Sequence, residues 1–270
     1  PMSSPSAPDD WRSYDAMEAR LTRPVTARML ELAGLAEGRR VLDVGCGTGE
    51  AGLAAAPLLG TSGFVLGIDL AEPMLALARE KASRAGAVNV AFHRADAQEL
   101  ALDAAFDVAL ARWSLMYVDD PERALERIRR SLVASGRLVA AFWAEPARVE
   151  FAWLPREVLS RFVTLPPEAR EGRGVFRFAD EATLQHALRR SGFTVELLEE
   201  LRVPVVEAPD GEALLRWVGV FGGGMARAIA ALEPQTRREL ADALTREAEP
   251  YRVGGTLQLG GVTRLVVARP

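Results

Sequence analysis

The chain has 270 residues, of which 49% are hydrophobic and 26% are charged, as in an ordinary soluble globular protein. Its net charge of −4 argues against a nucleic-acid partner, which would require a basic patch or stripe. One cysteine, no signal-peptide pattern and no apolar run near the roughly 18 residues of a membrane span favour a cytoplasmic protein without a membrane partner.

The chain is predicted to begin with two helices. Residues 11–21 carry Trp11 and Tyr14 three positions apart, which is a helical spacing. Pro24 stands where it can open a second helix that ends at Gly34. The first helix is a candidate lid over a ligand; the alternative is a helix that packs on the edge of a sheet.

Apolar runs and helical patterns then alternate as far as Phe142. Such alternation predicts right-handed βαβ units and a parallel sheet with helices on both faces. The predicted strands are Arg40–Val44, Phe64–Ile68, Val88–Phe92, Phe106–Ala111 and, after a turn at Gly136, Leu138–Phe142. The predicted helices are Gly49–Leu59, Pro73–Ala85 and one that Asp120 caps and Pro121 begins.

The pattern changes after Trp143, where residues 144–179 are rich in proline and aromatic residues. We interpret this stretch as an inserted cap. A helix capped by Asp180 and a strand at Phe193–Val206 follow, then a second helical insertion and a last strand at Thr256–Ala268. The predicted domain organisation is N-terminal helices over 1–37, a ligand-binding core over 38–145, cap insertions over 146–179 and 209–250, and core segments over 180–208 and 251–270.

The segment Val41-Leu-Asp-Val-Gly-Cys-Gly-Thr-Gly-Glu50 carries the clearest functional signal. Gly45, Gly47 and Gly49 lie between a strand and a helix, where glycine permits positive φ and close approach of a ligand. The pyrophosphate of a dinucleotide would be repelled by Asp43, and the dinucleotide fingerprint spaces its third glycine differently. A ligand with an ammonium and a sulfonium group, such as S-adenosylmethionine (SAM), suits this carboxylate better than NAD does.

Two more acids follow predicted strands. Asp69 ends the second strand and can accept both ribose hydroxyls, a contact that would also suit NAD. Asp96 follows the third strand and can accept from an adenine amino group, beside the backbone of Ala97. Helix capping is the alternative for both acids. Asp43, Asp69 and Asp96 are therefore expected at the carboxyl ends of three neighbouring strands, where open α/β sheets bind ligands.

These motifs resemble those of class I SAM-dependent methyltransferases, close to the ubiquinone/menaquinone-biosynthesis group. The glycine-rich segment, residues 94–100, residues 106–118 and the turn and strand from Ser135 resemble four motifs of that family. The resemblance implies a doubly wound sheet of seven strands, the last antiparallel, helical caps over the acceptor, and Met74 against the adenine. The residues expected to bind SAM are Asp43, Gly45, Cys46, Gly47, Gly49, Asp69, Leu70, Met74, Asp96, Ala97, Arg112 and Tyr14.

The sequence does not identify a catalytic base. Arg112, Trp113 and Tyr117 follow the fourth strand, at the end that faces the methyl group in this fold, and either line the acceptor or pack against the next helix. Tyr14, Tyr117 and His186 are the candidates for proton transfer, Cys46 is expected to pack rather than react, and no metal ligands cluster.

We therefore predict a SAM-dependent methyltransferase that acts at carbon or oxygen of a small, fairly apolar metabolite, as in natural-product biosynthesis. The alternative is a SAM-binding protein of the same fold that does not methylate and has a structural or cyclisation role. The expected assembly is a monomer or a homodimer.

Overall fold

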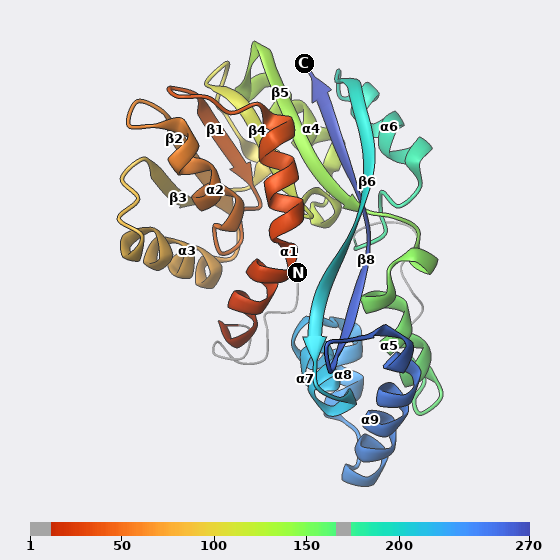
Figure 1. Ribbon diagram of the computed structural model, residues 1–270. Helices are drawn as coiled ribbons and strands as arrows, with labels where there is room; N and C mark the ends of the chain where they lie inside the picture. Colours follow the sequence, from red (N-terminus) through yellow and green to blue (C-terminus); the bar gives the residue numbers. More distant parts are fainter. Residues whose placement is uncertain (1–11, 166–173) are drawn as a thin grey trace. The chain divides into compact units, whose positions relative to one another are not determined.

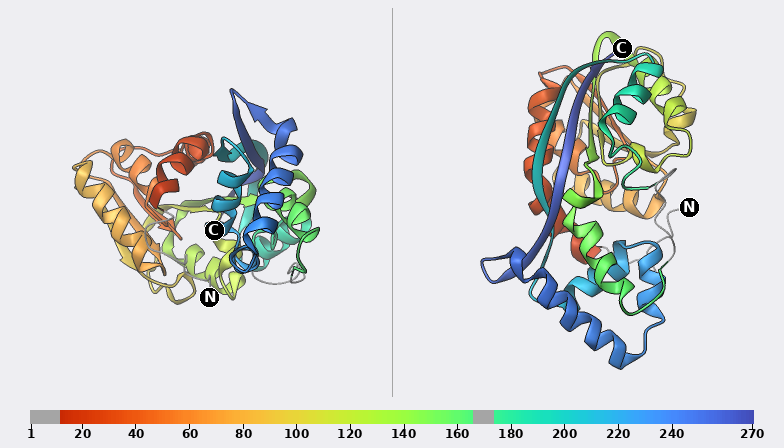
Figure 2. Two further views of the ribbon diagram at one scale, coloured as in Figure 1. Left: turned by 90° about the horizontal axis from the view of Figure 1, so that it is seen from below. Right: turned by 90° about the vertical axis from the view of Figure 1, so that its right-hand side faces the viewer.

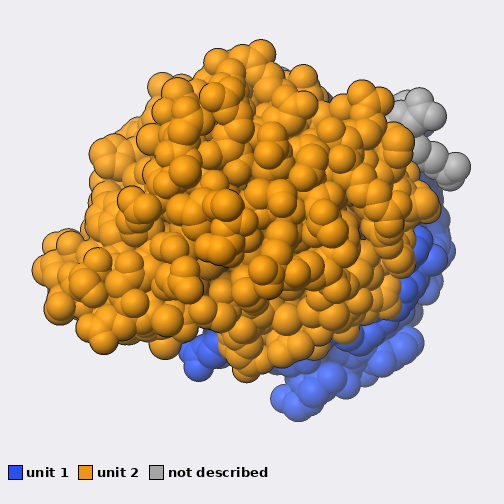
Figure 3. Space-filling model, turned by 90° about the horizontal axis from the view of Figure 1, so that it is seen from above, with its two compact units in different colours: residues 1–23, 145–168, 202–262 blue, residues 24–144, 169–201, 263–270 orange. Residues whose placement is uncertain are grey.

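The computed structural model describes residues 12–165 and 174–270 (Figure 1). These residues divide into two compact units, coloured separately in Figure 3. Unit 1 holds the described residues of 1–23, 145–168 and 202–262, and unit 2 holds those of 24–144, 169–201 and 263–270. Trp11, part of the predicted lid, and residues 166–173 of the first predicted insertion lie outside the described residues.

Seven strands follow one another across the sheet in the order β3-β2-β1-β4-β5-β8-β6, and a short β7 pairs with β8 off this path. β1 to β5 pair in parallel, whereas β8 runs antiparallel to β5, which confirms the predicted α/β sheet. The strands are β1 (Arg40–Val44), β2 (Phe64–Asp69), β3 (Val90–Arg94), β4 (Phe106–Arg112), β5 (Leu132–Trp143), β6 (Thr194–Ala208), β7 (Arg252–Val253) and β8 (Thr256–Arg269).

Helices cover both faces of the sheet in unit 2, as its apolar strands require. Figures 1 and 2 show α1 and α2 on one face and α4 and α6 on the other. The helices are α1 (Arg12–Ala33), α2 (Glu50–Ala55), α3 (Glu72–Arg84), α4 (Pro121–Ser131), α5 (Glu150–Ser160), α6 (Glu181–Arg190), α7 (Gly211–Phe221), α8 (Gly224–Ala230) and α9 (Pro234–Ala248), with 3-10 helices η1 (Ala56–Leu59), η2 (Ala97–Glu99), η3 (Leu115–Tyr117), η4 (Pro146–Arg148) and η5 (Glu249–Tyr251).

Two predicted helix caps are confirmed. Asp120 accepts a hydrogen bond from the backbone N–H of Arg123 at 3.0 Å at the start of α4. Asp180 accepts from the backbone N–H of Thr183 at 2.8 Å at the start of α6. Each cap satisfies a backbone donor that has no partner within its own helix.

The prediction of two N-terminal helices was wrong, because α1 continues through Pro24. A proline inside a helix removes one backbone hydrogen bond. However, Leu21, Val25 and Met29 form a buried stripe at spacings of four across the proline, with exposed fractions of 5%, 0% and 1%. Burial of that stripe favours one continuous helix over a break at Pro24.

The predicted turn at Gly136 is part of an irregular strand. β5 begins at Leu132, six residues before the predicted start, and Leu132 pairs with Phe106. The next pair is Arg137 with Val108, so residues 133–136 bulge opposite Asp107 alone. Periodicity could not show this bulge, because the register depends on the partner strand.

Unit 1 contains most of the two segments predicted as insertions, together with parts of α1, β6 and β8. A Cβ on Gly211 would lie 1.9 Å from the carbonyl oxygen of Ala241, so only glycine lets α7 approach α9 this closely. Gly222 and Gly223 separate α7 from α8. Among the described helices, none combines the length and the apolar character that crossing a membrane would need.

Candidate functional site

The glycine-rich loop joins β1 to α2 and is tied to the neighbouring strand. Gly45, Gly47 and Gly49 all have positive φ, at +65°, +54° and +81°. The backbone N–H of Cys46 donates to the carbonyl oxygen of Ile68 at 2.9 Å, which fixes the loop at the end of β2. The strand-to-helix turn that the sequence predicted is therefore present, and its conformation favours glycine at all three positions.

The surroundings of the three glycines differ. A Cβ on Gly45 would lie 2.3 Å from the Cβ of Ser114, and one on Gly49 would lie 2.6 Å from the Cζ of Phe92. A Cβ on Gly47 would meet only the Sδ of Met74, at 3.9 Å. Gly45 and Gly49 are thus required by packing, whereas the loop exposes open backbone at Gly47.

Asp69 borders this open backbone at the end of β2. Its Oδ2 accepts from the N–H of Gly47 at 2.9 Å, and its Oδ1 accepts from the N–H of Ala71 at 2.8 Å. The second bond precedes α3, whose N-cap is Ala71 without a side-chain capping bond, so Asp69 does not cap this helix. Because a carboxylate has about four acceptor positions, two bonds leave capacity for further donors such as hydroxyl groups.

Asp43 lies beneath the loop and is only 1% exposed. Its Oδ2 accepts from the N–H of Gly52 at 2.9 Å, at the start of α2. Burial raises the pKa of Asp43 to about 6; the Arg112 guanidinium and the Gly52 bond oppose this rise, and the Asp69 charge adds to it. A carboxylate held this way would be stabilised in its charged form by a cationic ligand.

The segment after β4 is held by contacts that the sequence did not reveal. Trp113 has φ +52°, unusual for a bulky residue, and its ring stacks on Trp143 with centroids 4.5 Å apart. The indole N–H of Trp113 donates to the Oγ1 of Thr263 at 2.8 Å, and the Arg112 guanidinium lies 5.2 Å from the Trp113 ring centroid. Thr263 is fully buried within β8, and no local signal in the sequence indicates this contact.

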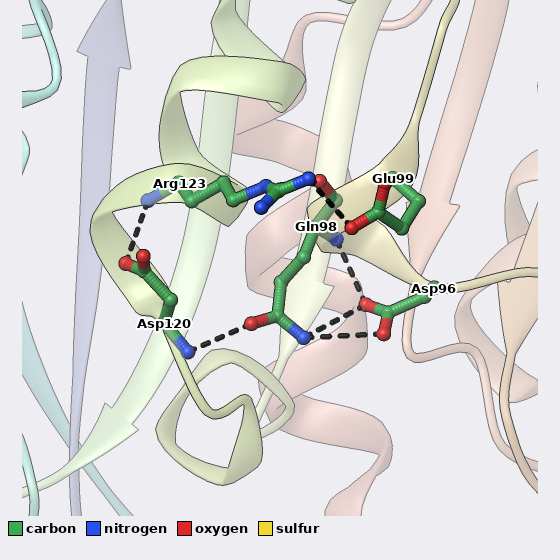
Figure 4. Close-up of polar contacts among 5 residues, drawn as sticks. All are labelled: Asp96, Gln98, Glu99, Asp120 and Arg123. Carbon is green, nitrogen blue, oxygen red and sulfur yellow. Dashed lines mark hydrogen bonds and ion pairs between the residues drawn. The ribbon is translucent and has the colours of Figure 1, made fainter.

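Asp96 lies between β3 and η2, where it caps the 3-10 helix. Its Oδ1 accepts from the backbone N–H of Gln98 at 2.9 Å, and the side-chain amide of Gln98 donates to both carboxylate oxygens (Figure 4). Ala97 is buried beside it. The capping alternative is therefore realised, and Gln98 is a contact that the sequence analysis missed.

The remaining candidates belong to separate elements of the fold. His186 is exposed on α6, and Tyr117 is half-buried in η3. Tyr14 belongs to unit 1, where its ring packs against Phe221 with centroids 5.7 Å apart. Burial raises the pKa of the Cys46 thiol, which keeps it protonated. Within residues 12–165 and 174–270, no group of three or more His, Cys, Asp or Glu side chains could hold a metal ion.

Comparison with known proteins identifies similar chains. A family model described as a methyltransferase domain matches residues 35–162. A nocamycin O-methyltransferase from Saccharothrix syringae is 31% identical over 256 residues, which cover 90% of each chain. A ubiquinone/menaquinone biosynthesis C-methyltransferase from Azotobacter vinelandii is 30% identical over 192 residues, or 66% of this chain and 75% of the relative. The fold is similar to that of the YcgJ protein from Bacillus subtilis, with a TM-score of 0.61, 18% identity, and 90% and 97% of the two chains covered.

Proposed function

Because this chain belongs to the SAM-dependent methyltransferases, we propose that it binds SAM at the carboxyl ends of β1, β2 and β3 and methylates a small, fairly apolar metabolite at carbon or oxygen. The observation that carries the proposed site is the open backbone at Gly47, bordered by the Asp69 carboxylate and Met74. A side chain at Gly47 would occupy the space that a ligand needs. The residues present therefore fit the cofactor.

Each acid has a distinct proposed role. Asp69 accepts the ribose hydroxyls with its remaining lone pairs, and Asp96 accepts from the adenine amino group beside Ala97. Buried Asp43 faces the positive charges of the methionine end, a role that its high pKa supports. The residues of unit 2 proposed to contact SAM are Asp43, Gly45, Cys46, Gly47, Gly49, Asp69, Leu70, Met74, Asp96, Ala97 and Arg112.

SAM supplies an electrophilic methyl group when it is bound. The chain's contribution is to hold donor and acceptor in line, and positioning of this kind can lower a barrier by up to roughly 7–11 kcal/mol. A base is needed only if the acceptor must lose a proton. Within unit 2, Tyr117 and His186 are the candidates for that step.

An apolar acceptor is supported by the aromatic content of the two inserted segments. Within unit 1, the Trp217 ring lies 5.3 Å from the Phe221 ring and 6.0 Å from the Phe151 ring. Among the relatives, one is named as an O-methyltransferase of nocamycin and another as a C-methyltransferase of ubiquinone/menaquinone biosynthesis. We further propose that the protein is cytoplasmic and is a monomer or a homodimer. Gel filtration with light scattering would test the oligomeric state.

The first experiment uses SAM labelled on its methyl group. The full chain is incubated with a small-molecule extract of its source cells, and mass spectrometry follows the label. A labelled metabolite with an equal amount of S-adenosylhomocysteine is expected, and it would identify the acceptor. The Asp69→Ala variant should yield much less of both products. Bound SAM with no labelled product from extracts of cells that make the protein would favour the alternative, a structural or cyclisation role without methylation.

A further inference from the structure

Gln98 holds the Asp96 carboxylate from two directions. Its backbone N–H donates to Oδ1 at 2.9 Å, as expected of a capping contact. Its side-chain Nε2 donates to Oδ1 at 3.0 Å and to Oδ2 at 3.1 Å, which capping does not require. Figure 4 shows the carboxamide of Gln98 facing the carboxylate edge. The side chain therefore fixes the rotation of a carboxylate that capping alone would leave free to turn.

These bonds also determine where Asp96 can accept another donor. A carboxylate offers about four lone-pair positions, two on each oxygen. Oδ1 accepts two of the bonds from Gln98 and Oδ2 accepts one. Among the contacts of the described residues, one position on Oδ2 is left, and its direction is set by Gln98.

The orientation of the Gln98 carboxamide is fixed by a second contact. The backbone N–H of Asp120 donates to the Oε1 of Gln98 at 2.8 Å. The amide oxygen is needed there as an acceptor, so the amide nitrogen must face Asp96. A glutamate could accept the hydrogen bond from Asp120 but would place a like charge against Asp96. A methionine could neither accept from Asp120 nor donate to Asp96.

Gln98 is in turn anchored to the first turn of α4. The Nε of Arg123 donates to the backbone oxygen of Gln98 at 3.0 Å, and its Nη2 lies 2.6 Å from the Oε1 of Glu99 (Figure 4). α4 itself is firmly packed, since Leu125 and Ile128 are 2% and 0% exposed. The direction of Asp96 is thus set by a helix with one buried face and not only by the loop after β3.

From this geometry we infer that Gln98 is a positioning residue that aims the remaining acceptor of Asp96 at the 6-amino group of adenine. The inference rests on the proposed SAM site and adds the residue that makes this site discriminate an amino-purine from one without the amino group. Loss of the Gln98 amide lets Asp96 turn, so the contact with the amino group weakens while contacts elsewhere on the ligand stay the same.

The test compares two ligands by calorimetry on the full chain. One is S-adenosylhomocysteine, and the other is its analogue in which hydrogen replaces the 6-amino group. We expect the wild type to prefer the first by about tenfold, the strength of one hydrogen bond to a charged acceptor. In Gln98→Met the preference should fall to about threefold or less, with little change in the affinity for the analogue. The matched control Gln185→Met, which loses exposed contacts to Glu181 and Arg189 on α6, should keep the wild-type preference.

A second variant separates positioning from general structure. Gln98→Glu keeps the acceptor for Asp120 but presents a like charge to Asp96, so the preference should be lost near neutral pH. It should return in part at about pH 5, where a protonated carboxyl can donate. A purely structural change would not restore the preference with acid, and it would weaken both ligands equally.

The outcomes distinguish the two proposals. If neither ligand binds the wild type, the proposed SAM site is wrong. If the wild type binds both equally, the Asp96 contact with adenine is wrong, although the rest of the site stands. If the wild type discriminates and folded Gln98→Met or Gln98→Glu discriminates equally well, the inference about Gln98 is overturned.

Discussion

The Asp43→Asn substitution isolates the effect of a buried charge. Asparagine has nearly the same shape and keeps an oxygen that can accept from the N–H of Gly52, which lies 2.9 Å from Oδ2 of Asp43. The variant therefore removes the ionisation and leaves the local hydrogen bond in place. Any difference that depends on pH must then come from the carboxyl group.

The magnitude follows from the pKa, which burial raises from 3.8 to about 6. For an acid with a raised pKa, the folded state disfavours the charged form. The protonated Asp43 side chain therefore contributes to the unfolding free energy in full below about pH 3.8, and this contribution is lost as the pH rises through about 6. The full loss is about 3 kcal/mol, and about 2 kcal/mol of it falls between about pH 4.5 and about pH 8.

Urea unfolding followed by tryptophan fluorescence at these two pH values measures the effect. The unfolding free energy of Asp43→Asn minus that of the wild type should be about 2 kcal/mol larger at the alkaline pH than at the acid pH. Asp103→Asn is the control, because the Asp103 side chain is 71% exposed. A difference between wild type and Asp43→Asn that does not change with pH would refute the assignment of a raised pKa to burial.

The same variant should weaken binding of SAM while it strengthens the fold. The proposed role of Asp43 is to face positive charge, and that attraction is lost with the carboxylate. Calorimetry at about pH 8, where the carboxylate is ionised, should show a drop of roughly tenfold or more in affinity. Unchanged affinity at that pH would leave Asp43 as a structural residue only.

Three further results are expected. Asp69→Ala loses the bonds to Gly47 and Ala71 and should lower the affinity for S-adenosylhomocysteine by roughly 10- to 100-fold in calorimetry; an unchanged affinity would rule out its ribose role. Gly45→Ala should lower the unfolding free energy by about 1–3 kcal/mol more than Gly47→Ala, because its Cβ would lie 2.3 Å from that of Ser114. Gly47→Ala should impair ligand binding more than Gly45→Ala, and equal losses in both assays would contradict the packing account. Cys46 should resist iodoacetamide at about pH 8 in the folded protein and react once it unfolds, because burial raises its pKa; rapid labelling of the folded protein would oppose this.

The sequence predicted β1 and β4 well, because these strands are short apolar runs that are mostly buried. The predicted and observed bounds of β1 agree at Arg40–Val44, and β4 differs by one residue. The glycine loop could also be predicted from the sequence, since positive φ and close packing leave few alternatives to glycine. These features are local, and a short stretch of sequence contains what determines them.

What the sequence could not show are contacts between segments far apart in the chain. The bond from Trp113 to Thr263 joins residues 150 positions apart, and neither residue type alone indicates it. Gln98 was overlooked for the same reason, because its orientation depends on contacts with Asp120 and Arg123 at the start of another helix. The continuity of α1 through Pro24 likewise depends on what the stripe around it packs against.

The position of β8 has a consequence for how the protein is made. β8 follows β5 and β6 along the chain, yet it lies between them in the sheet, and its pairing reaches Ala268, opposite Leu138. A ribosome that has translated β5 and β6 has therefore not yet produced the strand that joins them. Until β8 has been synthesised and has left the ribosome, the nascent chain presents open strand edges, the kind of surface on which aggregation begins.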